Sequence, residues 1–377
     1  MNEILNLFQY FGEIKWQMVV MWIIGGVMIY LAIAKEMEPT LLLPMGFGTI
    51  LVNLPLTGVI NQVFEGVEQH GAIELLFNAG IANELFPLLL FIGIGAMIDF
   101  EPLLTNPKLL LFGAAAQFGI FITFALAVVC GFDLRDAASI GIIGAADGPT
   151  AIFVSNVLDS KYSGAIMVAA YSYMALVPVI QPPVIKLVTT KKERAIKMEY
   201  TGKPVKKVTK ILFPIVVTVV AGVFAPQSVA LVGFLMFGNL IRACGVLDSL
   251  SETAQKVLAN LITILLGLSV SFQMNYEVFL RWETLLIIGL GLFAFVFDTV
   301  GGVMFAKFLN LFSKKKINPM IGAAGISAFP MSSRVVHKMG LEADPSNFLL
   351  MHTVGTNVSG QIASVIAGGI ILNFFLK

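Results

Sequence analysis

Residues 143–156, IGAADGPTAIFVSN, combine an isolated charge with a signal for an interrupted helix. Asp147 lies in a run that is otherwise apolar enough for a membrane, where an unpaired carboxylate is costly unless it serves a function. Gly148 and Pro149 follow at once, so a helical N–H is lost and carbonyl groups are freed beside the negative charge. The pattern predicts a cation site built on a broken helix.

Two other interpretations of Asp147 remain open from the residues alone. The carboxylate could simply cap the N-terminus of a helix. It could also carry a proton in place of a metal cation. The depth of the segment and the nearby hydroxyl of Thr150 favour an ion site, and a carboxylate with carbonyl and hydroxyl oxygens suits Na⁺.

A second interrupted segment contains Asn318, Gly322, Ser327 and Arg334. A guanidinium just beyond the interruption is suited to binding a carboxylate ligand. The alternative for Arg334 is a paired or interfacial arginine. Asn318 could be a helix start signal before Pro319, and Ser327 a small packing residue.

Further polar residues lie inside predicted membrane spans. Tyr171 and Tyr173 lie in the middle of a span, where a phenol can donate a hydrogen bond, bind an ion weakly or relay a proton. Asn357, in GTNVSG, offers an oxygen ligand or packing between helices. Asp298 lies deep in its helix and is either a second ion or proton position or a structural group.

The composition indicates a polytopic membrane protein, with 57% hydrophobic and 12% charged residues in 377. The formal net charge of +1 gives no indication of a nucleic-acid partner. Cys130 and Cys244 lie in apolar surroundings, so a disulfide framework is not expected. The sequence has no phosphate loop, nucleophile elbow or zinc motif, and its histidines lack metal-ligand spacing.

Ten apolar segments are predicted to cross or enter the bilayer as helices. They are residues 17–34, 40–59, 82–97, 109–130, 164–187, 211–224, 229–243, 254–271, 284–308 and 348–375. Two further stretches, 137–155 and 317–336, are rich in small residues and proline and are expected to be interrupted.

The basic loop at 188–210 is predicted to face the cytoplasm. The pattern of residues 91–100 recurs at 265–274, and IGAA occurs in both interrupted stretches, at 143–146 and 321–324, which indicates a repeat. We expect the two repeats to be inverted, as in many transporters. Parity of the crossings then makes the interrupted stretches re-entrant hairpins that enter from opposite faces. Because irregular backbone at membrane depth must be covered by protein or line a cavity, both tips are expected at the centre.

These observations give an all-α polytopic membrane protein with inverted repeats and two re-entrant or broken-helix hairpins. Residues 1–16 are expected to form a retained surface helix and 17–377 a single transmembrane domain. Within that domain, repeat 1 spans about 82–187, the basic loop 188–210, and repeat 2 about 254–377.

Four long motifs, GAADGPTAI, AAYSYMALVPVIQPPVIK, INPMIGAAGISAFPMSSRV and GLEADPSNFLLMHTVGTNVSGQIAS, resemble the β subunit of sodium-pumping biotin-dependent decarboxylases. That family includes the oxaloacetate, methylmalonyl-CoA, glutaconyl-CoA and malonate decarboxylase pumps. The resemblance extends from about residue 90 onward.

The resemblance implies a membrane subunit that receives carboxybiotin from a biotin carrier protein, decarboxylates it with uptake of a proton, and moves Na⁺ outward. It implies a bacterial cytoplasmic membrane, a separate carboxyltransferase subunit, a small membrane-anchored subunit and a homo-oligomeric β core. It also implies an elevator-like motion of a hairpin-bearing core against a scaffold. The alternative function is a secondary Na⁺-coupled carboxylate transporter or Na⁺/H⁺ antiporter that needs no partner.

By motif, the resemblance assigns roles to individual residues. Asp147, Tyr173 and Arg334 are the expected catalytic residues. Carboxybiotin binding is expected at Asn318, Gly322, Ser327 and Arg334, and Na⁺ binding at Asp147, Thr150, Tyr173, Ser327 and Asn357.

Overall fold

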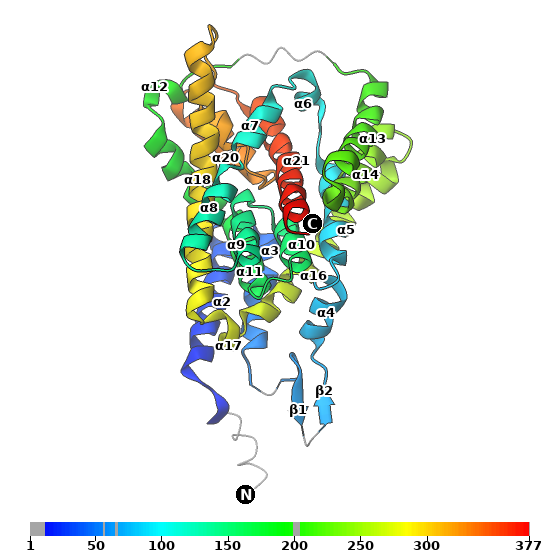
Figure 1. The fold of residues 1–377 in the computed structure, drawn as a ribbon, viewed down its shortest axis with the longest axis vertical. Coiled ribbons are helices and arrows are strands. Elements are labelled where there is room, and N and C mark those ends of the chain that lie inside the picture. Colours follow the sequence, from blue (N-terminus) through cyan, green and yellow to red (C-terminus); the bar gives the residue numbers. More distant parts are fainter. Residues whose placement is uncertain (1–11, 56, 65–66, 199–203, 377) are drawn as a thin grey trace, which may run out of the picture. The chain divides into compact units, whose positions relative to one another are not determined.

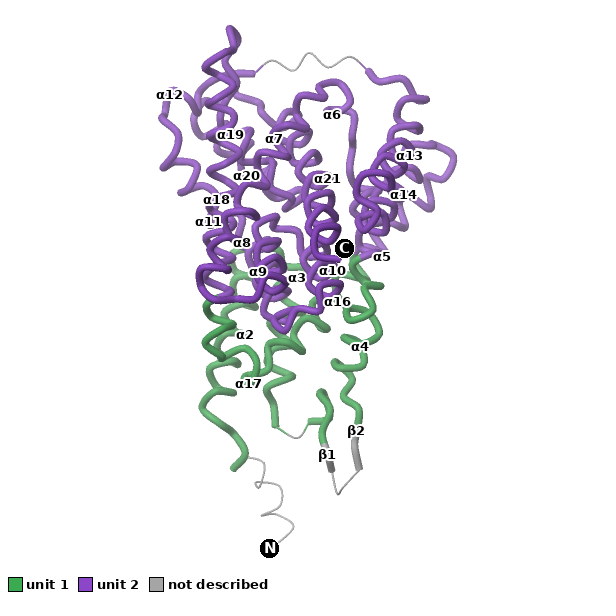
Figure 2. The backbone as a smooth tube through the Cα atoms, in the orientation of Figure 1, with its two compact units in different colours: residues 1–87, 260–286 green, residues 88–259, 287–377 purple. Residues whose placement is uncertain are grey.

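The computed structural model describes the whole chain except residues 1–11, 56, 65–66, 199–203 and 377 (Figure 1). The surface helix predicted for residues 1–16 therefore lies mostly outside the described residues. Contacts within the chain divide it into two compact units (Figure 2). Unit 1 comprises residues 1–87 and 260–286, and unit 2 comprises 88–259 and 287–377. The predicted repeat boundaries differ from this division and stay a prediction.

Unit 1 holds five complete helices and one small hairpin among its described residues: α2 (Trp16–Ala34), α3 (Pro39–Val52), β1 (Gln62–Phe64), β2 (Val67–Gln69), α4 (Ala72–Gly80), the 3₁₀ helix η5 (Ser271–Met274) and α17 (Tyr276–Phe279). The strands pair antiparallel, with Gln62 opposite Gln69. The helices α5 (Leu85–Met97), α16 (Ala259–Val270) and α18 (Trp282–Phe312) each have residues in both units.

Unit 2 holds the remaining described elements, which are all helical. They are α6 (Glu101–Thr105), α7 (Leu109–Ala115), α8 (Phe118–Val129), α9 (Leu134–Gly141), η2 (Ile142–Ala145), α10 (Gly148–Val157), α11 (Ser163–Val188), α12 (Lys191–Arg194), α13 (Lys207–Phe224), η3 (Pro226–Ser228), α14 (Val229–Cys244), α15 (Asp248–Glu252), the π-helical turn η4 (Thr253–Leu258), α19 (Met320–Ala323), α20 (Met331–Ala343) and α21 (Leu350–Phe375).

The predicted membrane fold is confirmed. Among the described residues, eight helices are long and apolar enough to cross a bilayer, and a ninth is possible if the pair α4 and α5, bent by 65°, counts as one broken span. The expected segment 40–59 is shorter in the structure, because α3 ends at Val52. The hairpin of β1 and β2 is a small exception to the all-α prediction.

Unit 1 is held together by close helix packing and by one buried amide. A Cβ atom on Gly25 would lie 2.6 Å from the carbonyl oxygen of Gly46, so α2 and α3 approach at backbone distance. The Asn53 amide donates to the Thr49 and Met274 carbonyls at 2.8 Å each. A buried asparagine thereby ties the end of α3 to η5.

Unit 2 is organised around α21, which is drawn in red beside α7 and α10 in Figure 1. Gly113 lets α7 pack directly against the α21 backbone at Ser359. On the α10 side, a Cβ atom on Gly368 would meet the Thr150 and Val154 methyl groups at 3.0 Å. Small residues therefore bring both neighbours close to α21.

Both predicted helix interruptions are present in unit 2. The first separates η2 from α10 at Ala146 and Asp147, and the second separates α19 from α20 over residues 324–330. Each broken segment is followed by a long helix, α11 in one case and α21 in the other. The order of elements matches the expected repeats, whose inverted relation stays a prediction.

Candidate functional site

The two helix interruptions meet inside unit 2. The Ser327 N–H donates to the Ala145 carbonyl at 3.1 Å, which joins the second interruption to the first. The Ser327 hydroxyl donates to the Gly360 carbonyl on α21 at 2.9 Å, and the Asn357 amide donates to the Ile326 carbonyl at 2.7 Å. Backbone groups that the broken helices leave free are thus paired across three elements.

The local sequence explains the first interruption. Ala146 has φ +51°, a left-handed conformation that stops η2. Asp147 is extended and serves as the N-cap of α10, where its carboxylate accepts the Thr150 N–H at 3.4 Å. Pro149 occupies the first turn of α10, where its missing N–H costs nothing. The capping role considered for Asp147 is therefore real, but it accounts for only one of its two oxygens.

The other Asp147 oxygen collects three neutral donors. The side chain is 2% exposed, and its Oδ2 accepts from the Thr150 hydroxyl at 2.7 Å, the Gln361 amide at 3.1 Å and the Ser364 hydroxyl at 2.8 Å. Within the described residues the Asp147 carboxylate forms no ion pair. A buried carboxylate with only neutral partners has the chemistry to take up a cation or a proton.

Gln361 and Ser364 were missed as partners of Asp147 in the analysis of the sequence. With Asn357 they lie at i, i+4 and i+7 on α21, so their side chains share one face of an otherwise apolar helix. That polar stripe was a usable signal. Asn357 Oδ1 is buried and has no hydrogen-bond partner in the described structure, which leaves an oxygen free close to the second interruption.

The two tyrosines of α11 have different surroundings. The Tyr171 ring packs against Gly148, directly after Asp147, and its buried hydroxyl has no hydrogen-bond partner among the described residues. The Tyr173 ring packs against Gly291 of α18, and its hydroxyl donates to the Ile288 carbonyl. Tyr171 is thus the phenol that borders the Asp147 interruption.

The remaining predicted site residues lie along α19 and α20. Gly322 packs backbone to backbone against Gly302 of α18, where no side chain would fit. The Asn318 amide donates to the Arg194 and Ile196 carbonyls at 2.8 and 2.9 Å. Arg334 lies on the exposed face of α20, and its guanidinium forms no ion pair in the described part of the chain.

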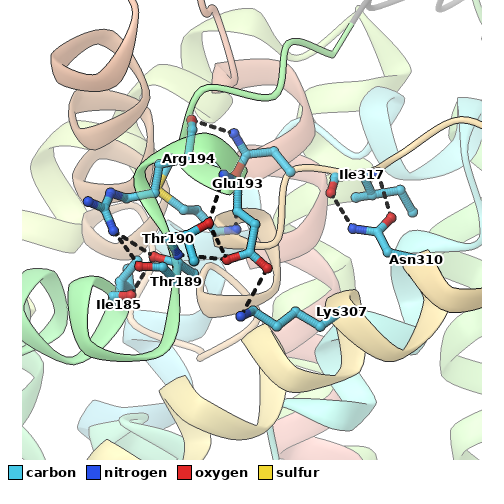
Figure 3. Close-up of polar contacts among 10 residues, drawn as sticks. Ile185, Thr189, Thr190, Glu193, Arg194, Lys307, Asn310 and Ile317 are labelled. Carbon is cyan, nitrogen blue, oxygen red and sulfur yellow. Dashed lines mark hydrogen bonds and ion pairs between the residues drawn. The ribbon is translucent and has the colours of Figure 1, made fainter.

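The segment that Asn318 holds is the end of the short helix α12, at the start of the basic loop. Figure 3 shows the polar contacts of Thr190, Glu193 and Arg194 in this segment. Thr190 and Glu193 form a reciprocal capping box, and Glu193 also accepts the Lys307 ammonium of α18 at 3.0 Å. The Arg194 guanidinium turns back to the Thr189 carbonyl at 2.6 Å. The beginning of the basic loop is therefore folded onto α18 and the entrance of α19.

Ion pairs fix the basic loop at two further points. Asp344 accepts the Ser346 hydroxyl and N–H, and its Oδ2 lies 3.1 Å from the Lys197 Nζ. These partners lower the pKa of Asp344 to about 2. The Lys210 ammonium, 2.5 Å from Glu101, and the Val205 N–H hold the pKa of that carboxyl below its ordinary value. The described parts of the loop on either side of residues 199–203 are thus both tied to helical elements of unit 2.

Asp298, on α18, caps the N-terminus of another helix, α8, at the break between α7 and α8. Its Oδ1 accepts the Gly119 N–H in the first turn of α8, directly after the break from α7. Its Oδ2 is buried without a hydrogen-bond partner in the described structure and lies against Gly144 of η2. The N-terminus of α8 therefore provides a favourable environment for this carboxyl group, which supports the structural interpretation of Asp298.

The donor set around Asp147 is oxygen-rich and contains no transition-metal ligands. Across the described residues, no three histidine, cysteine, aspartate or glutamate side chains gather where they could hold a metal ion. One carboxylate with hydroxyl, amide and carbonyl oxygens suits a weakly held monovalent cation.

Comparison with known proteins identifies the relatives of this chain. Residues 17–375 match the family described as the Na⁺-transporting oxaloacetate decarboxylase beta subunit. The chain is 50% identical to the methylmalonyl-CoA decarboxylase subunit beta of Propionigenium modestum, over 95% of this chain and 94% of the relative. It is 48% identical to the glutaconyl-CoA decarboxylase subunit beta of Acidaminococcus fermentans (96% and 94%). It is 43% identical to the probable oxaloacetate decarboxylase beta chain of Vibrio cholerae (100% and 100%).

The α8 cap predicts a graded effect of substitutions at Asp298. Asp298→Ala leaves the Gly119 N–H buried without an acceptor and is expected to lower the free energy of unfolding by about 1–3 kcal/mol. Asp298→Asn keeps an acceptor oxygen and should lose clearly less. Denaturant unfolding of the purified chain in detergent measures both, and equal losses for the two variants would contradict the capping role.

Proposed function

This chain belongs to the family of Na⁺-transporting oxaloacetate decarboxylase β subunits, and from that premise we propose that it decarboxylates carboxybiotin and couples the reaction to outward Na⁺ transport. The carboxybiotin is carried by a separate biotin carrier protein and is loaded on a carboxyltransferase subunit. A small membrane-anchored subunit and further copies of this chain complete the assembly. The chain is a multi-pass protein, and we propose the bacterial cytoplasmic membrane with the basic loop 188–210 facing the cytoplasm.

One observation carries the proposed cation site. A buried carboxylate, Asp147, lies where two broken helices meet, and all its described partners are neutral. Na⁺ supplies the missing positive charge. Its oxygen ligands in our proposal are those of Asp147, Thr150 and Ser327, the unpartnered Asn357 Oδ1, and freed backbone carbonyls.

Arg334 is the proposed binding group for the carboxylate of carboxybiotin. Its exposed position and the lack of an ion-pair partner in the described chain support this role, because a guanidinium can hold a carboxylate with two parallel hydrogen bonds. Asn318, Gly322 and Ser327 shape the segment that precedes it. Asn318 and Gly322 hold α12 and α18 against the start of α19 and α19 itself, and Ser327 holds α21 against the second interruption.

The reaction itself needs one proton. Cleavage of the N–CO₂⁻ bond releases CO₂ and leaves the electron pair on a ureido nitrogen, which takes up a proton to give biotin. We propose that Tyr173 passes this proton toward the bound cofactor and that the proton and Na⁺ compete at Asp147. Competition at shared oxygens couples the two movements, and an elevator-like motion of the interrupted helices would carry Na⁺ across the membrane.

Replacement of the proposed cation ligand should remove the Na⁺ response. Asp147→Asn keeps the size of the side chain and the capping oxygen but loses the charge. Na⁺-stimulated CO₂ release should therefore fall at least a hundredfold, a loss comparable to that of two hydrogen bonds to a charged group. The measurement is CO₂ release from carboxybiotin by the reconstituted complex at increasing Na⁺. Asp136→Asn is a matched control, because Asp136 of α9 is also a buried carboxylate with neutral donors, the Ser160 hydroxyl and the Lys161 backbone N–H. Full Na⁺-stimulated turnover in Asp147→Asn would sink the assignment.

The carboxylate-binding role of Arg334 predicts a charge-specific loss. Arg334→Gln should lower kcat/KM for carboxybiotin by about tenfold to a hundredfold, and Arg334→Lys should restore part of it. Lys338, exposed one turn further along α20, provides the control variant Lys338→Gln, which should behave as the wild type. Equal losses in Arg334→Gln and Lys338→Gln would point to a general electrostatic effect and contradict a specific site.

A further inference from the structure

We propose that Gln361 is a Na⁺ ligand of the Asp147 site, whose amide donates to the carboxylate in the arrangement described above and turns over to offer its oxygen when Na⁺ binds. The inference rests on the proposed Na⁺ site and assigns a role to a residue that the sequence motifs did not single out.

The hydrogen bonds on the Asp147 carboxylate show why Na⁺ binding needs a rearrangement. Asp147 Oδ2 receives three donors, from Thr150, Gln361 and Ser364, at 2.7 to 3.1 Å. These donors occupy the lone pairs through which Oδ2 would hold a cation. Donor hydrogens aimed at Oδ2 would also point at an incoming Na⁺ and repel it. Na⁺ can therefore bind this oxygen only if donors turn away.

The two hydroxyl groups can adapt without leaving their places. A hydroxyl oxygen has lone pairs as well as a proton, so it can become a ligand once its proton rotates. Ser364 has an alternative acceptor nearby, because its Oγ lies 3.0 Å from the backbone carbonyl oxygen of Gln361. With the Ser364 proton on that carbonyl, Ser364 Oγ is free to face the cation.

The Gln361 amide cannot adapt in this way. Its nitrogen has no lone pair to give, so its NH₂ group opposes a cation at Asp147 as long as it points there. Rotation of about 180° around the last side-chain bond exchanges the NH₂ group for Oε1 at nearly the same place. Gln361 is 2% exposed, and its amide is held close to the carboxylate, so this exchange needs no movement of the backbone.

The position of Gln361 connects the exchange to the second interruption. Asn357 lies one turn earlier on the same face of α21 and donates to the Ile326 carbonyl. Gly360, directly before Gln361, accepts the Ser327 hydroxyl. A change of partner at Gln361 therefore occurs on the stretch of α21 that holds the second broken helix.

Gln361→Met tests the proposal because a Na⁺ ligand and a mere hydrogen-bond donor predict opposite changes in the half-saturating Na⁺ concentration. Met has a similar length but neither donates nor accepts at this position. If the amide oxygen is a ligand of Na⁺, the half-saturating Na⁺ concentration should rise by about tenfold. If Gln361 only donates to the Asp147 carboxylate and thereby stabilises its Na⁺-free form, the loss of this donor should make Na⁺ bind more tightly, and that concentration should fall.

The measurement is the Na⁺-dependent rise in melting temperature of the full chain in detergent, with choline chloride keeping the ionic strength constant. Gln117→Met is the matched control, since Gln117 is a buried glutamine of unit 2 whose side chain, in the described structure, hydrogen-bonds only to the Gly113 carbonyl. Its half-saturating Na⁺ concentration should equal that of the wild type. Gln361→Leu carries the same prediction and replaces Gln361→Met if that variant does not fold.

The outcomes separate this inference from the proposed function. A wild-type chain without a Na⁺-dependent shift, or an Asp147→Asn variant with an unchanged shift, would overturn the Na⁺ site itself. The Na⁺-dependent rise in melting temperature could instead be lost in Asp147→Asn while the half-saturating Na⁺ concentration of Gln361→Met is unchanged or lower. That result would overturn the role of Gln361 alone.

Discussion

The structure of unit 2 depends on how a negative charge, the Asp147 carboxylate, is accommodated in an apolar interior. No described basic side chain reaches it, so its stability rests on the Thr150, Gln361 and Ser364 donors. Hydrogen bonds from neutral groups make the charge tolerable but leave it uncompensated. That imbalance is the physical property a reversible cation site requires, because a full counter-charge would leave nothing for Na⁺ to supply.

Backbone at membrane depth must be covered by protein, and small residues make this possible in unit 2. Gly322 meets Gly302 of α18, and Gly360 of α21 meets the Gly325 carbonyl, each at a distance that leaves no room for a side chain. Helices packed at backbone distance exclude lipid from the interruptions and bring freed carbonyls within reach of donors. The glycine contacts and the polar stripe of α21 are thus parts of one arrangement.

Much of this fold could be predicted from the sequence, because long apolar runs and Gly-Pro interruptions leave strong local signals. Eight helices long enough to cross a bilayer, the two interruptions, and the contact of Asp147 with Thr150 three residues on are present among the described residues, whereas the predicted segments 40–59 and 82–97 are shorter helices. The hydrogen bonds from Gln361 and Ser364 to Asp147 could not be predicted in the same way. They depend on which face of α21 packs against Asp147, and packing between segments more than 200 residues apart decides this.

Other differences have similar causes. Tyr171 and Tyr173 are indistinguishable by spacing, and only the rotation of α11 turns Tyr171 toward Gly148 and Tyr173 toward α18. The sequence places Asp298 deep in its helix, but it does not show that the tertiary partner of this carboxyl group is the Gly119 N–H of α8. Local patterns therefore identified the chemically active residue types, while long-range packing selected their partners.

The most direct test of the central claim is to determine high-resolution experimental structures of the chain in NaCl and in choline chloride. If Na⁺ binds as proposed, an ion lies within coordination distance of the Asp147 carboxylate and Asn357 Oδ1 in NaCl, and none lies there in choline chloride. An ordered Na⁺ elsewhere, with the Thr150, Gln361 and Ser364 donors unchanged on Asp147 in both salts, would contradict it.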